Sequence, residues 1–187
     1  MTGQTDYFGY LRERRLSGLL YRRLWLYPRL CRRLSGRVLD VGCGIGDFLR
    51  FRPGTIGVDV DANSVAWCRG LGLDAQLMPP DCLPFADEAF DGVVLDNVLE
   101  HLASPLALLG EIRRVLRKKG TLVVGVPGSR GYAADPDHKI PYDEQALVAC
   151  LRHSGFDCEQ IMHMPCRSDF LEARLRQYCL YGLFRPD

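Results

Sequence analysis

Residues 38–46 read Val-Leu-Asp-Val-Gly-Cys-Gly-Ile-Gly, an apolar run that ends in three alternating glycines. The apolar part predicts a buried strand, and the glycines predict a tight turn from that strand into a helix. Glycine permits positive φ angles and lets a ligand approach the backbone closely. The turn is therefore the first candidate for a ligand site, although a lone glycine turn is common to many nucleotide-binding proteins.

The spacing of the glycines argues against two classes of nucleotide site. A dinucleotide fingerprint G-x-G-x-x-G that starts at Gly42 needs a glycine at position 47, where this chain has Asp47. The chain also has no G-x-x-x-x-G-K-[ST] loop for a triphosphate. The spacing of the glycines is compatible with a cofactor that has no phosphate group.

Strands and helices alternate along the chain after this turn. Such alternation predicts one α/β domain with a largely parallel sheet that is covered on both faces. In a doubly wound sheet of this kind, ligands bind at the carboxyl ends of the strands. The predicted strands are 37–41, 55–60, 91–96, 121–126, 156–164 and 177–184, and the predicted helices are 62–71, 105–116, 143–154 and a short one near 169–176.

Residues 1–35 differ from the α/β core at 36–187 and predict a basic helical cap. Residues 1–37 hold nine arginines against two acidic residues, a net charge of +7, in a chain whose total is +1. The helical pattern runs from about Tyr7 to Leu34, and Pro28 predicts a break into two helices. Aromatic residues interleave with the arginines, which suits an anionic membrane surface or an RNA backbone. The plain alternative is a cap whose arginines are only solvated.

The composition narrows the class of protein. With 187 residues, 47% hydrophobic and 25% charged, the chain is typical of a single globular domain. Its eight cysteines form no C-x-x-C pair, so we expect free thiols in a reducing compartment. The absence of a secretory signal and of a run of 18 apolar residues predicts a cytoplasmic protein. Residues 5–34 give it a means of peripheral contact with an anionic membrane.

Asp59 ends the second predicted strand, 15 positions after Gly44. A carboxylate at this place can accept hydrogen bonds from both hydroxyls of a ribose. The alternatives are a solvated loop acid or the N-cap of the next helix, for which Asp61 is the better candidate. We therefore assign Asp59 to a ribose.

Several motifs in a fixed order resemble those of the class I S-adenosylmethionine-dependent methyltransferases, and among them the type-11 group. The resemblance covers about residues 36–126 and continues in the final helix and strand pair. It implies a Rossmann-like sheet of seven strands with the last one antiparallel, and methyl transfer from S-adenosylmethionine. Beside the glycine turn, the motifs are Leu83-Pro84-Phe85, Ala89-Phe90-Asp91, Val98-Leu99-Glu100-His101 and Arg114-Val115-Leu116-Arg117-Lys118-Lys119-Gly120.

The resemblance also implies which residues hold the cofactor. Its methionine part would lie on Asp40 and the glycine turn and under Asp96-Asn97, and its adenine on the segment before Leu83. Relatives usually have an Asp-Ala pair near the adenine, where residues 78–81 here are Met-Pro-Pro-Asp, and proline offers no N–H. With the ribose ligand included, the expected cofactor-binding residues are Asp40, Gly42, Cys43, Gly44, Gly46, Asp59, Val60, Asp81, Cys82, Asp96 and Asn97.

His101 is the candidate catalytic base, and its alternative is a helix-start histidine bonded to Glu100 or to backbone. Small-RNA and quinone-pathway O-methyltransferases resemble this region and bind a divalent metal through Glu-x-x-Glu-His. Here Asn97 replaces the first glutamate. Glu100, His101 and His138 could form a three-ligand site in principle, but the loss of that carboxylate predicts no metal.

The acceptor is not specified by any motif. The basic cap favours a small, lipid-linked or glycan-type acceptor, and RNA is the alternative. Two classes other than methyltransferases stay open. One is a cofactor-binding regulatory module without catalysis, and the other is a nicotinamide oxidoreductase, which the absence of a glycine at position 47 disfavours.

Overall fold

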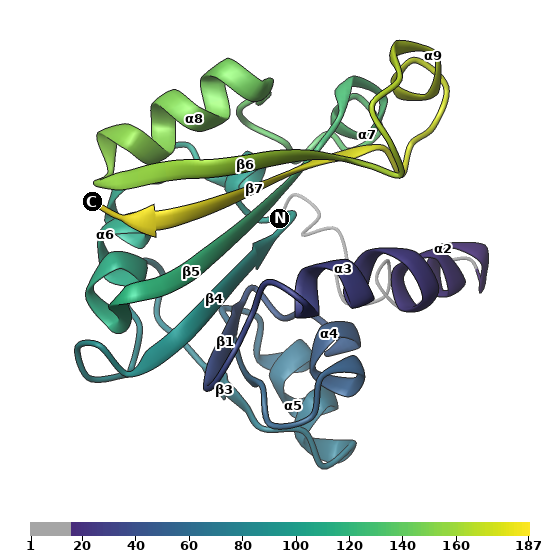
Figure 1. Cartoon of the computed structure of the whole chain (residues 1–187). Helices are drawn as coiled ribbons and strands as arrows, with labels where there is room; N and C mark the ends of the chain where they lie inside the picture. The colour runs from purple at the N-terminus through teal and green to yellow at the C-terminus, as the bar shows by residue number, and fades with distance from the viewer. Residues whose placement is uncertain (1–15) are drawn as a thin grey trace, which may run out of the picture.

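The sheet is built from short apolar runs whose side chains alternate between its two faces. The computed structural model describes residues 16–187, in which seven strands form one sheet in the order β3-β2-β1-β4-β5-β7-β6 (Figure 1). The strands from β3 to β5 pair in parallel, and β7 runs antiparallel between β5 and β6. The predicted mostly parallel sheet with an antiparallel last strand is confirmed. The strands are β1 (Val38–Val41), β2 (Ile56–Asp59), β3 (Ala75–Leu77), β4 (Phe90–Asp96), β5 (Leu116–Pro127), β6 (Phe156–Met164) and β7 (Cys179–Pro186).

Two strands differ from the sequence prediction. The sequence does not predict β3, because three residues are too few to show a periodicity. β5 begins at Leu116 rather than at Thr121, and its first residues extend past an irregularity in the pairing with β4. β5 is therefore longer at its amino-terminal end than the apolar pattern alone indicates.

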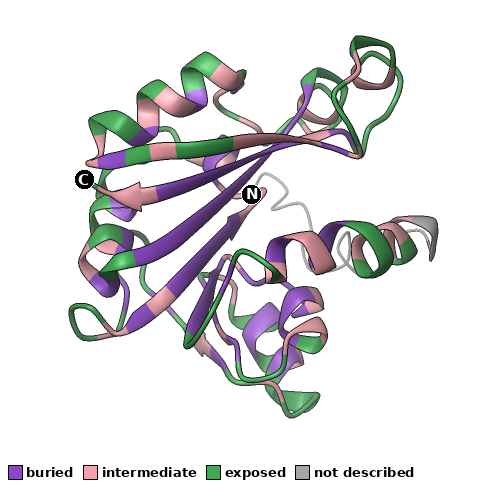
Figure 2. Ribbon diagram, in the orientation of Figure 1, coloured by how far each residue is buried: buried purple, intermediate pink, exposed green. Residues whose placement is uncertain are grey.

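Helices cover both faces of the sheet, and its central strands are buried between them (Figure 2). Alternate residues of β4 show this: Val93 packs in a cluster with α6 and α8, whereas Val94 packs with the N-terminal helices and α4. The strand order reverses between β1 and β4, and a doubly wound sheet binds its ligand at the carboxyl ends beside such a point. The helical segments are α2 (Leu16–Tyr21), η1 (Arg22–Leu26), α3 (Tyr27–Cys31), α4 (Asp47–Phe51), α5 (Ala62–Gly70), η2 (Leu99–His101), α6 (Leu106–Val115), α7 (Ser129–Tyr132), α8 (Glu144–His153) and α9 (Asp169–Glu172).

The cap is helical, but the predicted break at Pro28 is wrong. α2, η1 and α3 follow one another without interruption, and residues 21 and 27 at the two junctions have helical backbone angles. η1 is a π-helical stretch, so Pro28 falls in the first turn of the segment after it, where proline is tolerated. Residues 7–15 of the predicted cap lie outside the described residues.

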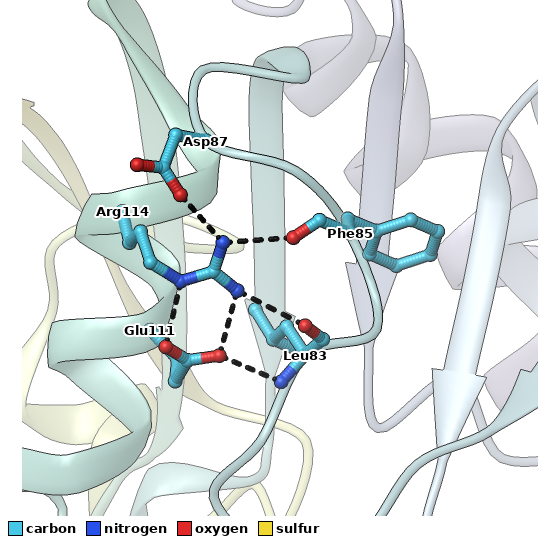
Figure 3. A network of polar contacts seen from close by, with 5 residues as sticks. All are labelled: Leu83, Phe85, Asp87, Glu111 and Arg114. Atoms are coloured by element: carbon cyan, nitrogen blue, oxygen red, sulfur yellow. Dashed lines mark hydrogen bonds and ion pairs between the residues drawn. The ribbon is translucent and has the colours of Figure 1, made fainter.

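A polar network fixes the loop that precedes β4 (Figure 3). The Arg114 guanidinium on α6 donates to both carboxylate oxygens of Glu111, at 2.8 Å each, and to the carbonyl oxygens of Leu83 and Phe85 at 3.0 and 2.8 Å. It also pairs with Asp87 at 2.8 Å, while the Leu83 N–H donates to Glu111 at 2.9 Å. The Leu83-Pro84-Phe85 motif and the motif that begins at Arg114 therefore have a structural role, because their contacts tie the loop before β4 to α6.

We expect Arg114→Ala to lower the free energy of unfolding by about 1–3 kcal/mol, because it removes charge-assisted hydrogen bonds and leaves loop carbonyls unpaired. Hydrogen bonds from Arg114 and Leu83 depress the pKa of Glu111 to about 2. The stabilisation is therefore present above the ordinary glutamate pKa and is lost as pH falls toward 2, so the variant's deficit should shrink at acid pH. Urea unfolding at several pH values measures both effects.

The matched control for this experiment is Arg113→Ala on the same helix. Arg113 pairs with Asp187, and both side chains are about half exposed, so its loss should cost less than about 1 kcal/mol. Equal costs for the two variants would contradict the assignment of Arg114 as the anchor of the loop.

Among the helices between residues 16 and 187, none is both long and apolar enough to cross a bilayer.

Candidate functional site

The glycine turn leaves β1 beside the point where the strand order reverses. Gly42, Gly44 and Gly46 all have positive φ angles, of 74°, 51° and 77°. A Cβ atom on Gly42 would lie 2.4 Å from the Val98 side chain, so the turn has no room for one there. The carbonyl oxygen of Gly44 accepts a hydrogen bond from the Cys68 thiol at 3.3 Å, which holds the turn onto α5. The turn is a rigid feature of this fold.

Asp59 at the end of β2 is buried and faces the turn. One carboxylate oxygen accepts from the Gly44 N–H at 2.8 Å, and the other accepts from the Asp61 N–H at 2.9 Å. Burial raises the pKa of Asp59, and these backbone hydrogen bonds oppose that shift. Each oxygen keeps a further lone pair for a ligand. The predicted N-cap role of Asp61 is confirmed, because its side chain accepts from the backbone of Asn63 and Ser64.

A small cavity lies between the glycine turn, the end of β4 and the cap. Its volume of about 50 Å³ holds a few water-sized groups, which suits the head of a ligand rather than a whole nucleoside. Six of the expected cofactor-binding residues line it together, and five residues that the sequence analysis does not assign to the cofactor join them. The first group is Asp40, Gly42, Cys43, Gly44, Asp96 and Asn97, and the second is Arg22, Tyr27, Ile45, Asp47 and Phe48.

Arg22 is turned inward and forms an ion pair across this cavity. Its guanidinium lies 3.1 Å from Asp96 and also donates to the Tyr27 hydroxyl at 3.3 Å. Asp96 accepts further hydrogen bonds from the Tyr181 hydroxyl at 2.7 Å and the Asn97 amide at 2.8 Å. The sequence analysis treats the arginines of the cap as one group, and the structure separates Arg22 from that group. The signal that the sequence analysis missed is Asp96, a strand-end acid that is mostly buried and gains a cationic partner.

Carboxylates crowd one side of the cavity. Asp40 is buried beneath it, and desolvation together with Asp96 and Asp59 raises the pKa of Asp40 well above its usual value. Of the other two acids in the lining, Asp96 is paired with Arg22, and Asp47 is paired with Arg50, which does not line the cavity. A positively charged ligand group beside Asp40 would favour its ionised form.

The other five expected cofactor residues lie outside the lining of this cavity. Gly46 ends the glycine turn as the N-cap of α4. Asp59 and the exposed Val60 stand at the end of β2, and Asp81 and Cys82 follow β3, both exposed. The Met78 N–H donates to the Asp59 carbonyl oxygen at 3.0 Å, so the two strand ends are joined.

Glu100, His101 and His138 come together beyond the end of β4. Their ligand atoms lie within 4.8 Å of one another, and the two histidine rings meet edge to face with centroids 4.6 Å apart. Glu100 is fully buried, and neither of its carboxylate oxygens has a hydrogen-bond partner among residues 16–187. Burial raises its pKa to about 8. Burial and the neighbouring His138 lower the pKa of His101. The absence of a metal here stays a prediction.

Comparison with known proteins assigns the family. The family model described as "Methyltransferase domain" matches residues 39–124. A "Probable S-adenosylmethionine-dependent methyltransferase" of Mycolicibacterium smegmatis is 30% identical and is covered to 66%, with 80% of this chain in the match. A protein of Mycobacterium tuberculosis with the same description is 32% identical, and the match covers 70% of this chain and 53% of that protein.

Solved structures agree on the fold. The crystal structure of a SAM-dependent methyltransferase from Archaeoglobus fulgidus has a TM-score of 0.74 and 22% identity, and the match covers 96% of this chain and all of that one. The chain spans 66% and 53% of the length of these two curated relatives. The ordered motifs, the strand order and these relatives lead to one assignment: the chain belongs to the class I S-adenosylmethionine-dependent methyltransferases, in the type-11 group, whose cofactor is S-adenosylmethionine.

Proposed function

We propose that this chain transfers a methyl group from S-adenosylmethionine to a small lipid-linked or glycan-type acceptor. The observation that carries the cofactor part of the proposal is the polar lining of the cavity. Arg22, Asp40 and Asp96 lie together around a space about the size of an amino-acid head group, between the glycine turn and the end of β4. S-adenosylmethionine offers a carboxylate to the arginine, and an ammonium and a sulfonium to the acids. The residues present therefore fit this cofactor.

Each part of the cofactor has a complementary group on the chain. Arg22, with the Tyr27 hydroxyl beside it, suits the carboxylate, because a guanidinium pairs with carboxylates through a planar fork. Asp96 and Asp40 suit the ammonium. Asp59 has a spare lone pair on each oxygen for the ribose hydroxyls, and Val60 is an exposed apolar surface for the adenine.

We expect Arg22→Ala to weaken the binding of S-adenosylhomocysteine about tenfold, because it removes a charged hydrogen-bond partner worth about 1.5 kcal/mol. Arg22→Lys should lose less, since it keeps the charge. The matched control is Arg23→Ala, because the Arg23 side chain is exposed and does not line this cavity. Calorimetry that gives the same affinity for Arg22→Ala and Arg23→Ala would leave the cap without a role at the cofactor.

The chain's contribution to the reaction is alignment and proton removal. When bound, S-adenosylmethionine supplies an activated methyl group, whose bond to sulfur breaks with the electron pair left on sulfur as the acceptor atom bonds to carbon. Holding reactants in line is worth up to about 7–11 kcal/mol, so few catalytic side chains are needed. His101 follows Asn97 by a single turn of η2, and its lowered pKa keeps it neutral near pH 7, as a base requires.

Apolar side chains around the cap support a lipid-linked acceptor. Leu20, Leu24 and Trp25 are 50%, 73% and 42% exposed on the cap, and Phe170 on α9 is 61% exposed. The Trp25 indole N–H donates to the Pro165 carbonyl oxygen at 3.2 Å, so the cap meets the segment that leads to α9. Exposed aromatic and aliphatic side chains beside arginines are typical of contact with lipid interfaces. The same surface would give peripheral contact with an anionic membrane.

A methyl-acceptance screen tests the proposed function. Purified protein and methyl-labelled S-adenosylmethionine are incubated with lipid, glycan, small-molecule and RNA fractions of a cell extract. We expect label in the lipid or glycan fraction, and no label with Asp96→Ala protein. Label in RNA alone would replace the acceptor class. Tight cofactor binding without label in any fraction would indicate a regulatory module instead.

A further inference from the structure

A second cavity lies where β4 and β5 begin, at the end of the sheet opposite to the glycine turn. Its volume of about 300 Å³ is at the lower end of the range of small-molecule sites. The end of the cap, the start of β5 and the end of β7 supply its walls. Five of its residues are cationic, Arg32, Arg33, Arg117, Lys119 and Arg185, and one is acidic, Asp91.

Two of the five cations are neutralised by acids. Arg117 forms an ion pair with Asp91, which also accepts from the Arg37 N–H at 2.8 Å. Arg185 pairs with Glu159 on β6 and donates to the Lys119 carbonyl oxygen at 2.7 Å. These contacts hold the two arginines in place and consume the one acid of the cavity. We therefore count Arg117 and Arg185 as structural residues of the cavity and not as its binding groups.

The other three cations have no acidic partner among residues 16–187. Arg32 donates through Nε to the carbonyl oxygen of Pro28 at 3.2 Å, which leaves the rest of its guanidinium available. The side chains of Arg33 and Lys119 form no ion pair with a described carboxylate. Three like charges that line one concave space repel one another, and an anion relieves that repulsion.

We propose that this cavity is a binding site for a phosphate-bearing ligand, held by Arg32, Arg33 and Lys119. Guanidinium groups bind phosphate oxygens in pairs, and a lysine adds a point charge. A diphosphate or a phosphomonoester carries enough charge to balance these residues. The ligand is a separate molecule from the cofactor, because Asp91 and Asp96 on β4 are five residues apart, which spans roughly 15 Å of strand. The site does not depend on the identity of the methyl acceptor.

Titration of the full chain with inorganic pyrophosphate tests this site. We expect one saturable binding event, and we expect it to weaken about tenfold or more in Arg33→Ala/Lys119→Ala, which lacks two charged hydrogen-bond donors. The charge-matched control is Lys139→Ala/Arg152→Ala, whose two exposed side chains lie outside the cavity. The control should bind within about twofold of the wild type, since distant surface charges are screened by salt. Both variants should keep their thermal stability and their affinity for S-adenosylhomocysteine.

Two further arms identify the source of the phosphate. Sedimentation with vesicles of phosphatidic acid in phosphatidylcholine, with pure phosphatidylcholine as blank, tests a lipid headgroup. Vesicle binding that pyrophosphate displaces, and that Arg33→Ala/Lys119→Ala loses, supports the site with a lipid source, whereas pyrophosphate binding alone supports it with a soluble source. The proposal is overturned if neither probe binds, or if both double variants lose binding equally. Binding of single-stranded RNA that pyrophosphate does not displace, without binding of either probe, would overturn it as well.

Discussion

We expect Gly44→Val to lower the affinity for S-adenosylhomocysteine by more than about 100-fold, or about 2.7 kcal/mol. Gly44 has a φ of 51° and lines the cavity that we assign to the head of the cofactor. A β-branched side chain is strained at positive φ, and its methyl groups would enter space that the ligand needs. The Gly44 N–H also orients Asp59, so a shifted turn would misplace the ribose ligand too. Calorimetry measures the loss.

Gly72→Val is the matched control for this substitution. Gly72 has a φ of 74°, and a Cβ atom there would meet nothing within 4 Å. Both variants therefore carry backbone strain of about 1–2 kcal/mol, but only the first intrudes on the site. Thermal unfolding should report similar destabilisation, while the affinity should fall in Gly44→Val alone. Unchanged affinity in Gly44→Val would mean that the cofactor binds elsewhere.

His101→Ala should lower turnover about 100-fold and leave cofactor affinity unchanged, because a positioned general base contributes at least about that factor.

A chelator should have no effect on the methyl-transfer rate of the wild type. Hard divalent cations prefer carboxylate oxygens, and the chain has Asn97 where metal-dependent relatives have a glutamate. With Glu100 as the single anionic group of the cluster, a divalent ion would be held weakly. Methyl-transfer rates before and after dialysis against chelator measure this.

Two histidine variants serve as controls. His138→Ala should reduce turnover less than His101→Ala, because His138 donates from Nδ1 to the Tyr132 carbonyl oxygen at 2.8 Å and supports its neighbour. His153→Ala on the exposed end of α8 should change nothing. Activity that vanishes with chelator and returns with added metal would move Glu100, His101 and His138 into a ligand set.

Local patterns predicted the strand–turn–helix units of this fold and the acids that end or cap them. The apolar run before Gly42, the strand-end acid Asp59 and the cap Asp61 lie where the sequence predicted them, because short-range sterics and nearby hydrogen bonds determine each one. The π-helical stretch before Pro28 was not predictable in this way. It accommodates a proline that a purely local rule takes as a break, and its Leu26 side chain is buried in a cluster with Val94 and Val123 of the sheet.

By itself, the sequence determined the family motifs, the parallel sheet and the glycine turn after β1. The tertiary structure alone decided which residues each arginine of the basic segment meets. Arg22 meets Asp96, which is 74 positions away, and Arg33 shares a cavity with Lys119 on β5. Neighbouring arginines on one helix have the same composition and periodicity, so only the packing of that helix on the sheet separates the inward side chain from those at the opposite edge.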